Sequence, residues 1–210
     1  MRSLLNGRGR FVAAALVLSG LLAAPAQAAG DAANPLGCTP KPTLSQSFAP
    51  WGDTNQYTPV TNAGFEAGVL GWTVSLGANV VVGNEPWKIG GAQDRYALEL
   101  ANGASAVSAP LCIDETYPHF RLFVRNAGTL KGALRIEVLY LDKKGRIVST
   151  KAYDYKDATA AWQPTGFVGI DVFGSKKAPD SAPVAFRFTA SGNGVRYQID
   201  DVYVDPRLAK

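Results

Sequence analysis

The sequence predicts an all-β protein built as a sandwich of two antiparallel sheets. Short segments in which apolar and polar residues alternate recur along the chain, and this alternation is typical of half-buried strands. Glycine, proline, asparagine and aspartate separate the segments, as expected for turns. No stretch has the apolar period of about 3.6 residues that marks an amphipathic helix. Stacked sheets are therefore favoured over helical layers.

The alternation places each strand in turn. In one segment, Phe120 and Leu122 share a face while Arg121 and Arg125 lie opposite, so that one face is apolar and the other polar. The strands predicted in this way cover residues 72–76, 96–100, 119–126, 134–140, 184–188 and 195–205, and a turn at 142–145 predicts a hairpin into Ile147-Val148.

The first 28 positions have the pattern of a secretory signal peptide. Arginines at 2, 8 and 10 precede an apolar run over 11–24, which is short for a bilayer span, and Ala26-Gln27-Ala28 fits the small-residue cleavage rule. We expect residues 1–28 to be removed and the mature chain to be secreted. An uncleaved membrane anchor is the alternative.

The charge balance argues against a nucleic-acid partner. The chain has 21 Lys and Arg against 17 Asp and Glu, and the predicted signal peptide holds three of the arginines, which leaves 18 basic residues against 17 acidic ones. No basic patch remains in the mature chain. We also expect no membrane contact after cleavage, because no later segment is long and apolar enough to span a bilayer.

The mature chain divides into an arm and a body. Residues 29–59 are rich in proline and predict an extended arm, whose Trp51 and Tyr57 we expect to lie on the domain surface. Residues 60–206 form the predicted sandwich domain, and their number suits a single core.

The chain has two cysteines, Cys38 and Cys112. In an oxidising compartment an even count favours a disulfide between them, with two independent buried thiols as the alternative. Neither cysteine has another Cys or His at zinc-ligand spacing, so a zinc site is not predicted.

The last predicted strand changes its phase in the middle. Ile199 fits one alternation, but Val202 and Val204 fit the opposite one, so one residue is inserted at Asp200-Asp201. Such an insertion predicts a β-bulge. Two adjacent carboxylates in an apolar strand are costly unless they are paired or bind a cation.

Two motifs resemble the galactose-binding-like jelly-roll superfamily. They are Asn62-Ala-Gly-Phe-Glu-Ala-Gly ahead of Gly71-Trp72, and Gln198-Ile-Asp-Asp-Val-Tyr-Val near the C-terminus. The chain looks most like the carbohydrate-binding modules of secreted glycosidases, and is similar to uncharacterised single-domain secreted proteins of actinobacteria. The resemblance covers residues 60–206 and implies a jelly-roll sandwich.

The same resemblance implies a structural calcium ion. Carried over to this sequence, its ligands are Glu66 together with Asp200 or Asp201, and such hard oxygen ligands suit Ca²⁺. The alternative is that Glu66 pairs with an arginine while an aspartate caps the bulge. Trp72 matches a core position of the superfamily.

Several catalytic chemistries lack their residues. His119 is the only histidine, and the sequence contains no G-x-S-x-G, H-E-x-x-H or glycine-rich phosphate-loop motif. We expect His119 to be an ordinary hydrogen-bonded residue. A glycoside hydrolase needs only two carboxyl groups at a suitable distance, and that possibility stays open for Glu85, Glu99, Glu115 and Glu137.

Sugar binding needs flat aromatic rings with polar side chains nearby. Trp87 lies in a flexible polar loop, and Trp162 precedes a Gln-Pro pair. Each could instead pack on the domain, Trp87 over the sandwich edge and Trp162 in the core. The residues predicted to bind the ligand are Trp87, Asn84, Glu85, Arg95 and Trp162.

These observations predict a secreted, non-catalytic protein that binds a polysaccharide or cell-wall glycan. The alternatives are a secreted structural or protein-interaction domain that binds other secreted proteins, and, third, a glycoside hydrolase. A contiguous apolar patch would favour the interaction domain.

Overall fold

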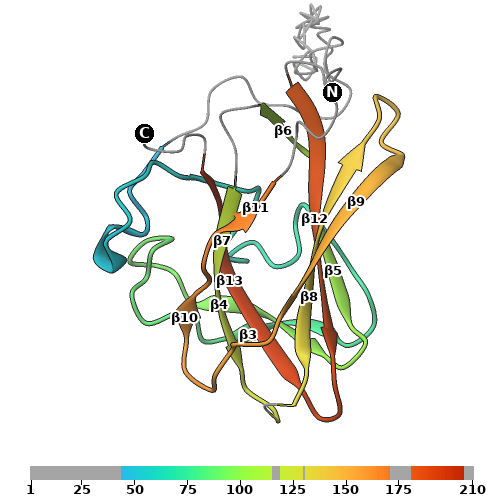
Figure 1. Ribbon diagram of the computed structural model, residues 1–210. Coiled ribbons are helices and arrows are strands. Elements are labelled where there is room, and N and C mark those ends of the chain that lie inside the picture. The colour runs from blue at the N-terminus through green and yellow to red at the C-terminus, as the bar shows by residue number, and fades with distance from the viewer. Residues whose placement is uncertain (1–43, 115–118, 130, 171–180, 206–210) are drawn as a thin grey trace, which may run out of the picture. The chain divides into compact units, whose positions relative to one another are not determined.

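The protein is a sandwich of two antiparallel β-sheets (Figure 1). The computed structural model describes residues 44–114, 119–129, 131–170 and 181–205. Over these ranges the single helical segment is the 3₁₀ turn η1 (Ala49–Trp51), and none of the helical structure in them could cross a bilayer. The predicted all-β, jelly-roll class is confirmed.

The first sheet contains the C-terminal strand at its centre. Its order is β10 (Gln163–Pro164), β7 (His119–Asn126), β13 (Arg196–Asp205), β4 (Tyr96–Ala101) and β3 (Ala78–Val82), while β1 (Thr58–Pro59) also pairs with β13 and β11 (Val168–Gly169) with β7. The second sheet has the order β2 (Trp72–Val74), β5 (Ser105–Ser108), β12 (Ser181–Ser191), β8 (Ala133–Leu141) and β9 (Ile147–Tyr155), and β6 (Leu111–Asp114) also pairs with β12.

The sequence placed these strands correctly where the alternation is regular. The predicted strand over 119–126 has the same bounds as β7, and the predicted hairpin turn joins β8 to β9. The alternation works because side chains of a strand point to opposite faces, and only one face of each sheet meets the core.

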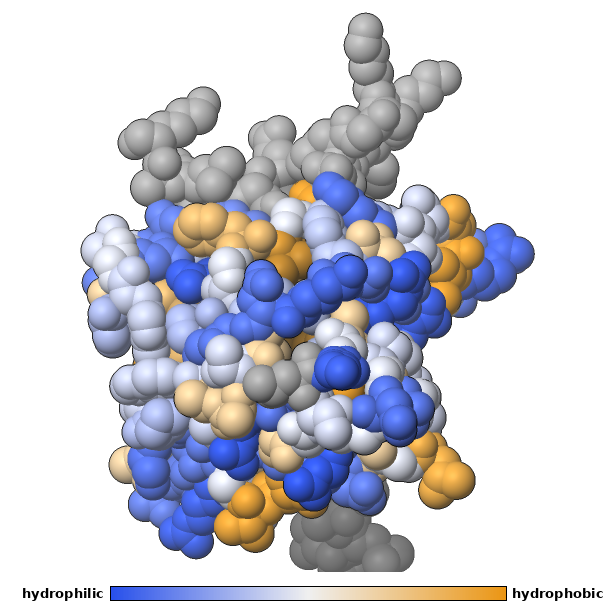
Figure 2. Space-filling model, turned by 60° about the horizontal axis from the view of Figure 1, so that its bottom comes forward, coloured by the Kyte–Doolittle hydropathy of each residue, from blue (hydrophilic) through white to orange (hydrophobic). Residues whose placement is uncertain are grey.

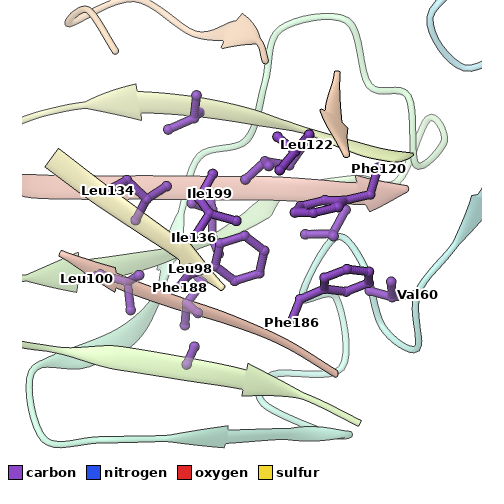
Figure 3. Close-up of a cluster of buried hydrophobic side chains, with 14 of the residues drawn as sticks. Val60, Leu98, Leu100, Phe120, Leu122, Leu134, Ile136, Phe186, Phe188 and Ile199 are labelled. Carbon is purple, nitrogen blue, oxygen red and sulfur yellow. The ribbon is translucent and has the colours of Figure 1, made fainter. Parts of the chain in front are cut away.

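Aromatic and aliphatic side chains fill the space between the sheets (Figure 3). Phe120 of β7 and Phe186 of β12 come from opposite sheets, and their ring centroids lie 4.3 Å apart. Trp72 is 7% exposed and packs 4.9 Å from the ring of Phe65, which confirms the core position expected for it.

The Asn62 motif forms a tight turn before β2. The Asn62 side-chain amide donates to the carbonyl oxygens of Gly68 (2.9 Å) and Leu70 (3.1 Å), and its oxygen accepts from the N–H of Ala67 (3.0 Å). Both Asn62 (φ 51°) and Phe65 (φ 59°) have left-handed backbone angles, which this turn stabilises. The turn buries Phe65 and leaves the next residue, a glutamate, exposed.

The described part of the predicted arm covers the outer face of the first sheet, defined here as the face turned away from the core. Phe48 and Tyr57 are fully buried there, against Phe123 and Tyr203. The Phe48 and Phe123 rings are stacked, with centroids 5.3 Å apart. The arm therefore adds a second hydrophobic cluster outside the sandwich.

The predicted bulge in the last strand is confirmed. The pairing of β13 with β7 shifts between Asp200 and Tyr203, and Asp201 has a φ of 47°. Beyond the shift, Val202 and Val204 point into the core, while Tyr203 packs in the outer cluster.

Several predictions fall on parts of the chain that lie outside the described residues. They concern the signal peptide at 1–28, the start of the arm, Cys38 and Glu115. Cys112 is half-buried in β6, and no free cysteine occurs in the described ranges. The disulfide stays a prediction.

Candidate functional site

Acidic side chains gather beside the bulge of β13. Oxygens of Glu85, Asp94 and Asp201 all lie within 4.8 Å of one another, and each of the three residues is at most 3% exposed. Asp200, next in the chain to Asp201, is also fully buried. We call Glu85, Asp94, Asp200 and Asp201 the carboxylate cluster.

The loop between β3 and β4 wraps around the cluster. The Glu85 carboxylate accepts from the N–H groups of Trp87 and Ile89, both at 2.5 Å, and the Glu85 N–H donates to Asp200 (3.2 Å). The N–H of Gly90 donates to Asp201 Oδ2 at 3.0 Å. Backbone donors thus hold some of the oxygens, while the loop carries two of the four acids.

Asp94 is the least satisfied member of the cluster. It is 3% exposed, and within the described ranges neither of its carboxylate oxygens accepts a hydrogen bond of normal geometry. An ionised carboxylate that is buried away from water costs far more free energy than a neutral polar group unless it is paired or binds a cation. A bound cation would remove that cost, since it would neutralise the negative charge.

The pKa values of the cluster agree with a site that binds a cation. Burial, with the neighbouring acids, raises the pKa of Asp94 to about 6 and that of Asp201 to about 8. Burial together with Asp201 and Asp94 raises the pKa of Asp200 to about 10. Without a cation, the folded protein holds these acids partly protonated.

The residues present fit a hard divalent cation such as Ca²⁺, which prefers carboxylate and carbonyl oxygens. Small residues line the cluster: a Cβ added at Gly64 would meet Asp94 and Asp201 oxygens at 3.3 Å, and one at Gly90 would meet Asp201 at 3.1 Å. The backbone of these two glycines therefore approaches the acids closely.

Of the predicted metal ligands, Asp200 and Asp201 lie in the cluster, while Glu66 is exposed at its rim. Glu66 accepts from the backbone N–H groups of Arg95 (2.7 Å) and Tyr96 (2.8 Å), and it contributes to the raised pKa of Asp94. Sequence reasoning missed Asp94, because an aspartate in a polar loop carries no signal of burial.

A row of polar side chains crosses the outer face of the first sheet. Asn79 of β3 pairs with Glu99 of β4, Glu99 with Gln198 of β13, and Gln198 with Arg125 of β7. These four positions alternate with core residues on their own strands, so their side chains point outward. We call them the polar row.

Hydrogen bonds fix the centre of the polar row. Arg125 Nε donates to Gln198 Oε1 at 2.8 Å, and Gln198 Nε2 donates to Glu99 Oε2 at 2.6 Å. The Arg125 guanidinium also lies 5.1 Å from the ring centroid of Trp162, which ends the row beyond β7. Its donors and acceptors are therefore held in place.

The structure brings two of the five predicted ligand residues to this face. Trp162 is half-buried beside Arg125, and Trp87 is 43% exposed, with its ring 4.8 Å from Trp51 and 5.6 Å from Phe123.

The other three lie elsewhere. Glu85 is turned into the carboxylate cluster. Asn84 is half-buried and lies near Asp94, whose pKa it lowers in part. Arg95 is exposed and donates from Nη2 to Gln93 Oε1 at 3.0 Å.

Comparison with known proteins gives structural matches only. No family model matches the sequence, and no curated protein does. The enzymatically active domain of tailspike protein 4 of bacteriophage CBA120 is similar over 70% of this chain and 21% of its own, with 15% identity and a TM-score of 0.51. The chain thus spans about a fifth of the tailspike chain, and the likeness shows a shared fold.

Solved carbohydrate-binding modules are also similar. TmCBM61 in complex with β-1,4-galactotriose matches 70% of this chain and 97% of its own, with 18% identity and a TM-score of 0.41. The family 11 module from Clostridium thermocellum, in complex with a β-1,3-1,4-mixed-linked tetrasaccharide, matches 73% and 98%, with 14% identity and a TM-score of 0.44.

Proposed function

We propose that this chain is a secreted, non-catalytic carbohydrate-binding protein that binds a polysaccharide or cell-wall glycan on the outer face of its first sheet. The observation that carries the proposal is the polar row, with the indole ring of Trp162 against Arg125 at one end. Trp87 lies on the same face, against Trp51 and Phe123. A carbohydrate needs such a surface because its ring faces are apolar while its hydroxyls both donate and accept hydrogen bonds.

The polar row offers the required chemistry. Glu99 can only accept, Arg125 can only donate, and Asn79 and Gln198 can do both. The hydrogen bonds between Arg125, Gln198 and Glu99 hold these three side chains before a ligand arrives, so ordering them on binding costs little side-chain entropy. Neighbouring strands lie about 4.8 Å apart, so the row from β3 to β7 extends about 14 Å, which suits several linked sugar rings.

The face seen in Figure 2 favours a glycan over a protein partner. On the face seen in Figure 2, apolar residues form small separate patches among hydrophilic ones. A protein-interaction surface is expected to expose a larger contiguous apolar area.

A structural Ca²⁺ in the carboxylate cluster is part of the proposal. Glu85, Asp94 and Asp201 would hold it, with Asp200 beside them. The ion would supply positive charge where the loop that carries Trp87 brings acids together. The loop would then keep Trp87 against Trp51 at the edge of the outer face.

Retention on polysaccharides tests the proposed function. The purified protein is mixed with insoluble cellulose, xylan, galactan and cell-wall preparations, and soluble polysaccharides are tested by affinity electrophoresis. We expect at least one polysaccharide to retain the protein, with Arg125→Ala and Trp87→Ala binding at least tenfold more weakly.

Val148→Ala is the matched control, because Val148 is 64% exposed on β9 of the other sheet. It is expected to bind as the unchanged protein does. If no polysaccharide retains the protein, or the three variants bind alike, glycan binding on this face is wrong.

Secretion and the disulfide are tested on the exported protein. N-terminal sequencing is expected to start at Ala29, and thiol titration under denaturing, non-reducing conditions is expected to find no free thiol. An N-terminus at Met1, or two free thiols, would contradict these two parts of the proposal.

A further inference from the structure

A cleft of about 440 Å³ opens beside the described arm, at a place separate from the polar row. Trp51, Asp53 and Asn55 of the arm line it, together with Arg121 of β7 and Phe167. On β7, Phe123 lies between Arg121 and Arg125, and the arm covers Phe123. The arm thus divides the outer face into two regions.

A buried ion pair forms the polar wall of the cleft. Arg121 Nη1 lies 2.6 Å from Asp53 Oδ2, and the two side chains are 9% and 8% exposed. Arg121 Nε donates to the Thr165 carbonyl at 2.8 Å, and its guanidinium lies 4.3 Å from the Phe48 ring centroid and 5.3 Å from that of Phe167. Contacts on several sides therefore fix the guanidinium.

Asp53 accepts further hydrogen bonds besides those of the ion pair. Its carboxylate accepts from the Tyr57 hydroxyl (2.6 Å) and from the Asn55 N–H (3.2 Å). Tyr57 Oη lies 3.4 Å from His119 Nε2, which is 2.8 Å from Asp205 Oδ2. The chain of contacts makes the wall rigid, and it gives His119 the hydrogen-bonded role expected from the sequence.

The charges of the Asp53–Arg121 pair balance each other. Burial would raise the pKa of Asp53, but hydrogen bonds from Tyr57 and Arg121 outweigh it and hold the pKa below its usual value. Burial lowers the pKa of His119 to about 4, so the imidazole is neutral at neutral pH. The cleft therefore presents a fixed acceptor beside a fixed donor, with no net charge on the pair.

We infer that the cleft is a second saccharide site, which takes one or two neutral sugar rings with adjacent free hydroxyls. Neighbouring hydroxyls can donate to Asp53 and accept from Arg121 at once, whereas an anion would meet Asp53 and a cation would meet Arg121. Trp51 and Phe167 supply apolar surface for the ring faces. The cleft volume lies in the range of small-ligand pockets, roughly 300–1,000 Å³.

The site differs from the polar row in the length of ligand that it takes. A cleft of this volume suits one or two sugar rings, as a free mono- or disaccharide or the end of a chain, while the row of about 14 Å suits the middle of a chain. The inference does not depend on polysaccharide binding at the polar row.

NMR titration tests the cleft. Glucose, galactose, mannose, xylose, arabinose and β-1,4-linked disaccharides are added to the ¹⁵N-labelled full-length mature protein. We expect at least one of them to shift the amides of Asn55, Gly166 and Phe167 in a saturable way. Oligosaccharides of increasing length, with and without a chemically reduced end, then distinguish a site for chain ends from a site for free sugars. A site for chain ends binds each chain with the same affinity whatever its length.

Phe167→Ala is the test variant, because Phe167 is 61% exposed and its truncation is therefore expected to leave the fold intact. We expect it to weaken this binding at least tenfold, and Asn55→Ala to weaken it as well. Glu99→Gln, in the polar row, is expected to leave it unchanged.

The inference is wrong if none of these saccharides shifts the cleft amides, if Phe167→Ala leaves the affinity unchanged, or if glucuronate binds more tightly than glucose. If no polysaccharide retains the protein but a saccharide shifts the cleft amides, only the glycan site at the polar row is wrong. If a polysaccharide retains the protein but no saccharide shifts the cleft amides, only the saccharide site in the cleft is wrong.

Discussion

Carboxylate oxygens of Glu85 and Asp201 lie within 4.8 Å of each other, although one residue comes from the loop after β3 and the other from the bulge of the last strand. Two buried acids at this distance repel each other unless a proton or a cation lies between them. The charge state of the carboxylate cluster therefore affects the free energy of unfolding of the whole sandwich.

Calcium is expected to raise the melting temperature of the protein. At a concentration of about 100 times its dissociation constant, an ion that binds only the folded state adds about 2.7 kcal/mol, or roughly 5–10 °C for a domain of this size. Differential scanning fluorimetry with calcium and with EDTA measures the shift. Asp94→Asn is expected to abolish it, and Glu99→Gln, outside the cluster, to retain it. An equal melting temperature in calcium and in EDTA would show that the proposed metal site is wrong.

The calcium effect is expected to grow between pH 6 and pH 8. Asp94 and Asp201 have pKa values raised to about 6 and about 8, above the ordinary 3.8. Groups raised in this way stabilise the metal-free fold at low pH, and this contribution is lost as the pH rises through the folded values. Calcium replaces the protons, so its advantage increases over that window.

Melting curves at pH 6, 7 and 8, each with calcium and with EDTA, measure this difference. His119 acts in the opposite direction and at lower pH, because its pKa is lowered from 6.5 to about 4 and its contribution is lost on acidification between those values. A calcium shift that is the same at all three pH values would contradict the assignment of these acids as ligands.

Asn62→Ala is expected to destabilise the fold by roughly 2–3 kcal/mol. The change removes three hydrogen bonds and places alanine at a left-handed backbone angle. Urea unfolding measures the loss. Asn79→Ala, at an exposed position of the polar row, serves as the control and is expected to change stability by less than about 0.5 kcal/mol. Equal effects of the two variants would contradict the role given to the Asn62 turn.

Phe48→Ala is expected to cost about 3–5 kcal/mol, because Phe48 is fully buried between the arm and β7. Leu44→Ala, at a residue that is 46% exposed in the same arm, is the matched control and is expected to be nearly neutral. Urea unfolding of both variants compares them. A small effect of Phe48→Ala would mean that the arm is an accessory to the fold.

Much of the fold could be predicted from the sequence, since alternation reports which face of a strand is buried. The bulge was visible because Val202 and Val204 are out of phase with Ile199. The second cluster on the outer face was not, because Phe48 lies in a segment without alternation. Its burial depends on the path that the arm takes after folding.

The candidate site was predictable only in part. Asp200 and Asp201 stood out as acids in an apolar strand, whereas Asp94 reaches them only because the loop closes. Glu99 was considered only as one of several candidate hydrolase carboxyl groups, and its place in the polar row follows from the register of β4 against β13. Pairing between strands far apart in sequence is decided by tertiary packing.

The bulge has a consequence for how this chain tolerates change. Loss of a single codon at Asp201 would reset the pleat of everything that follows, because successive side chains alternate between faces. Tyr203 would then turn inward and its two valine neighbours outward. The loss of one residue would therefore exchange core and outer side chains at three positions at once. Substitutions at this point are therefore expected to disturb the fold less than insertions or deletions do.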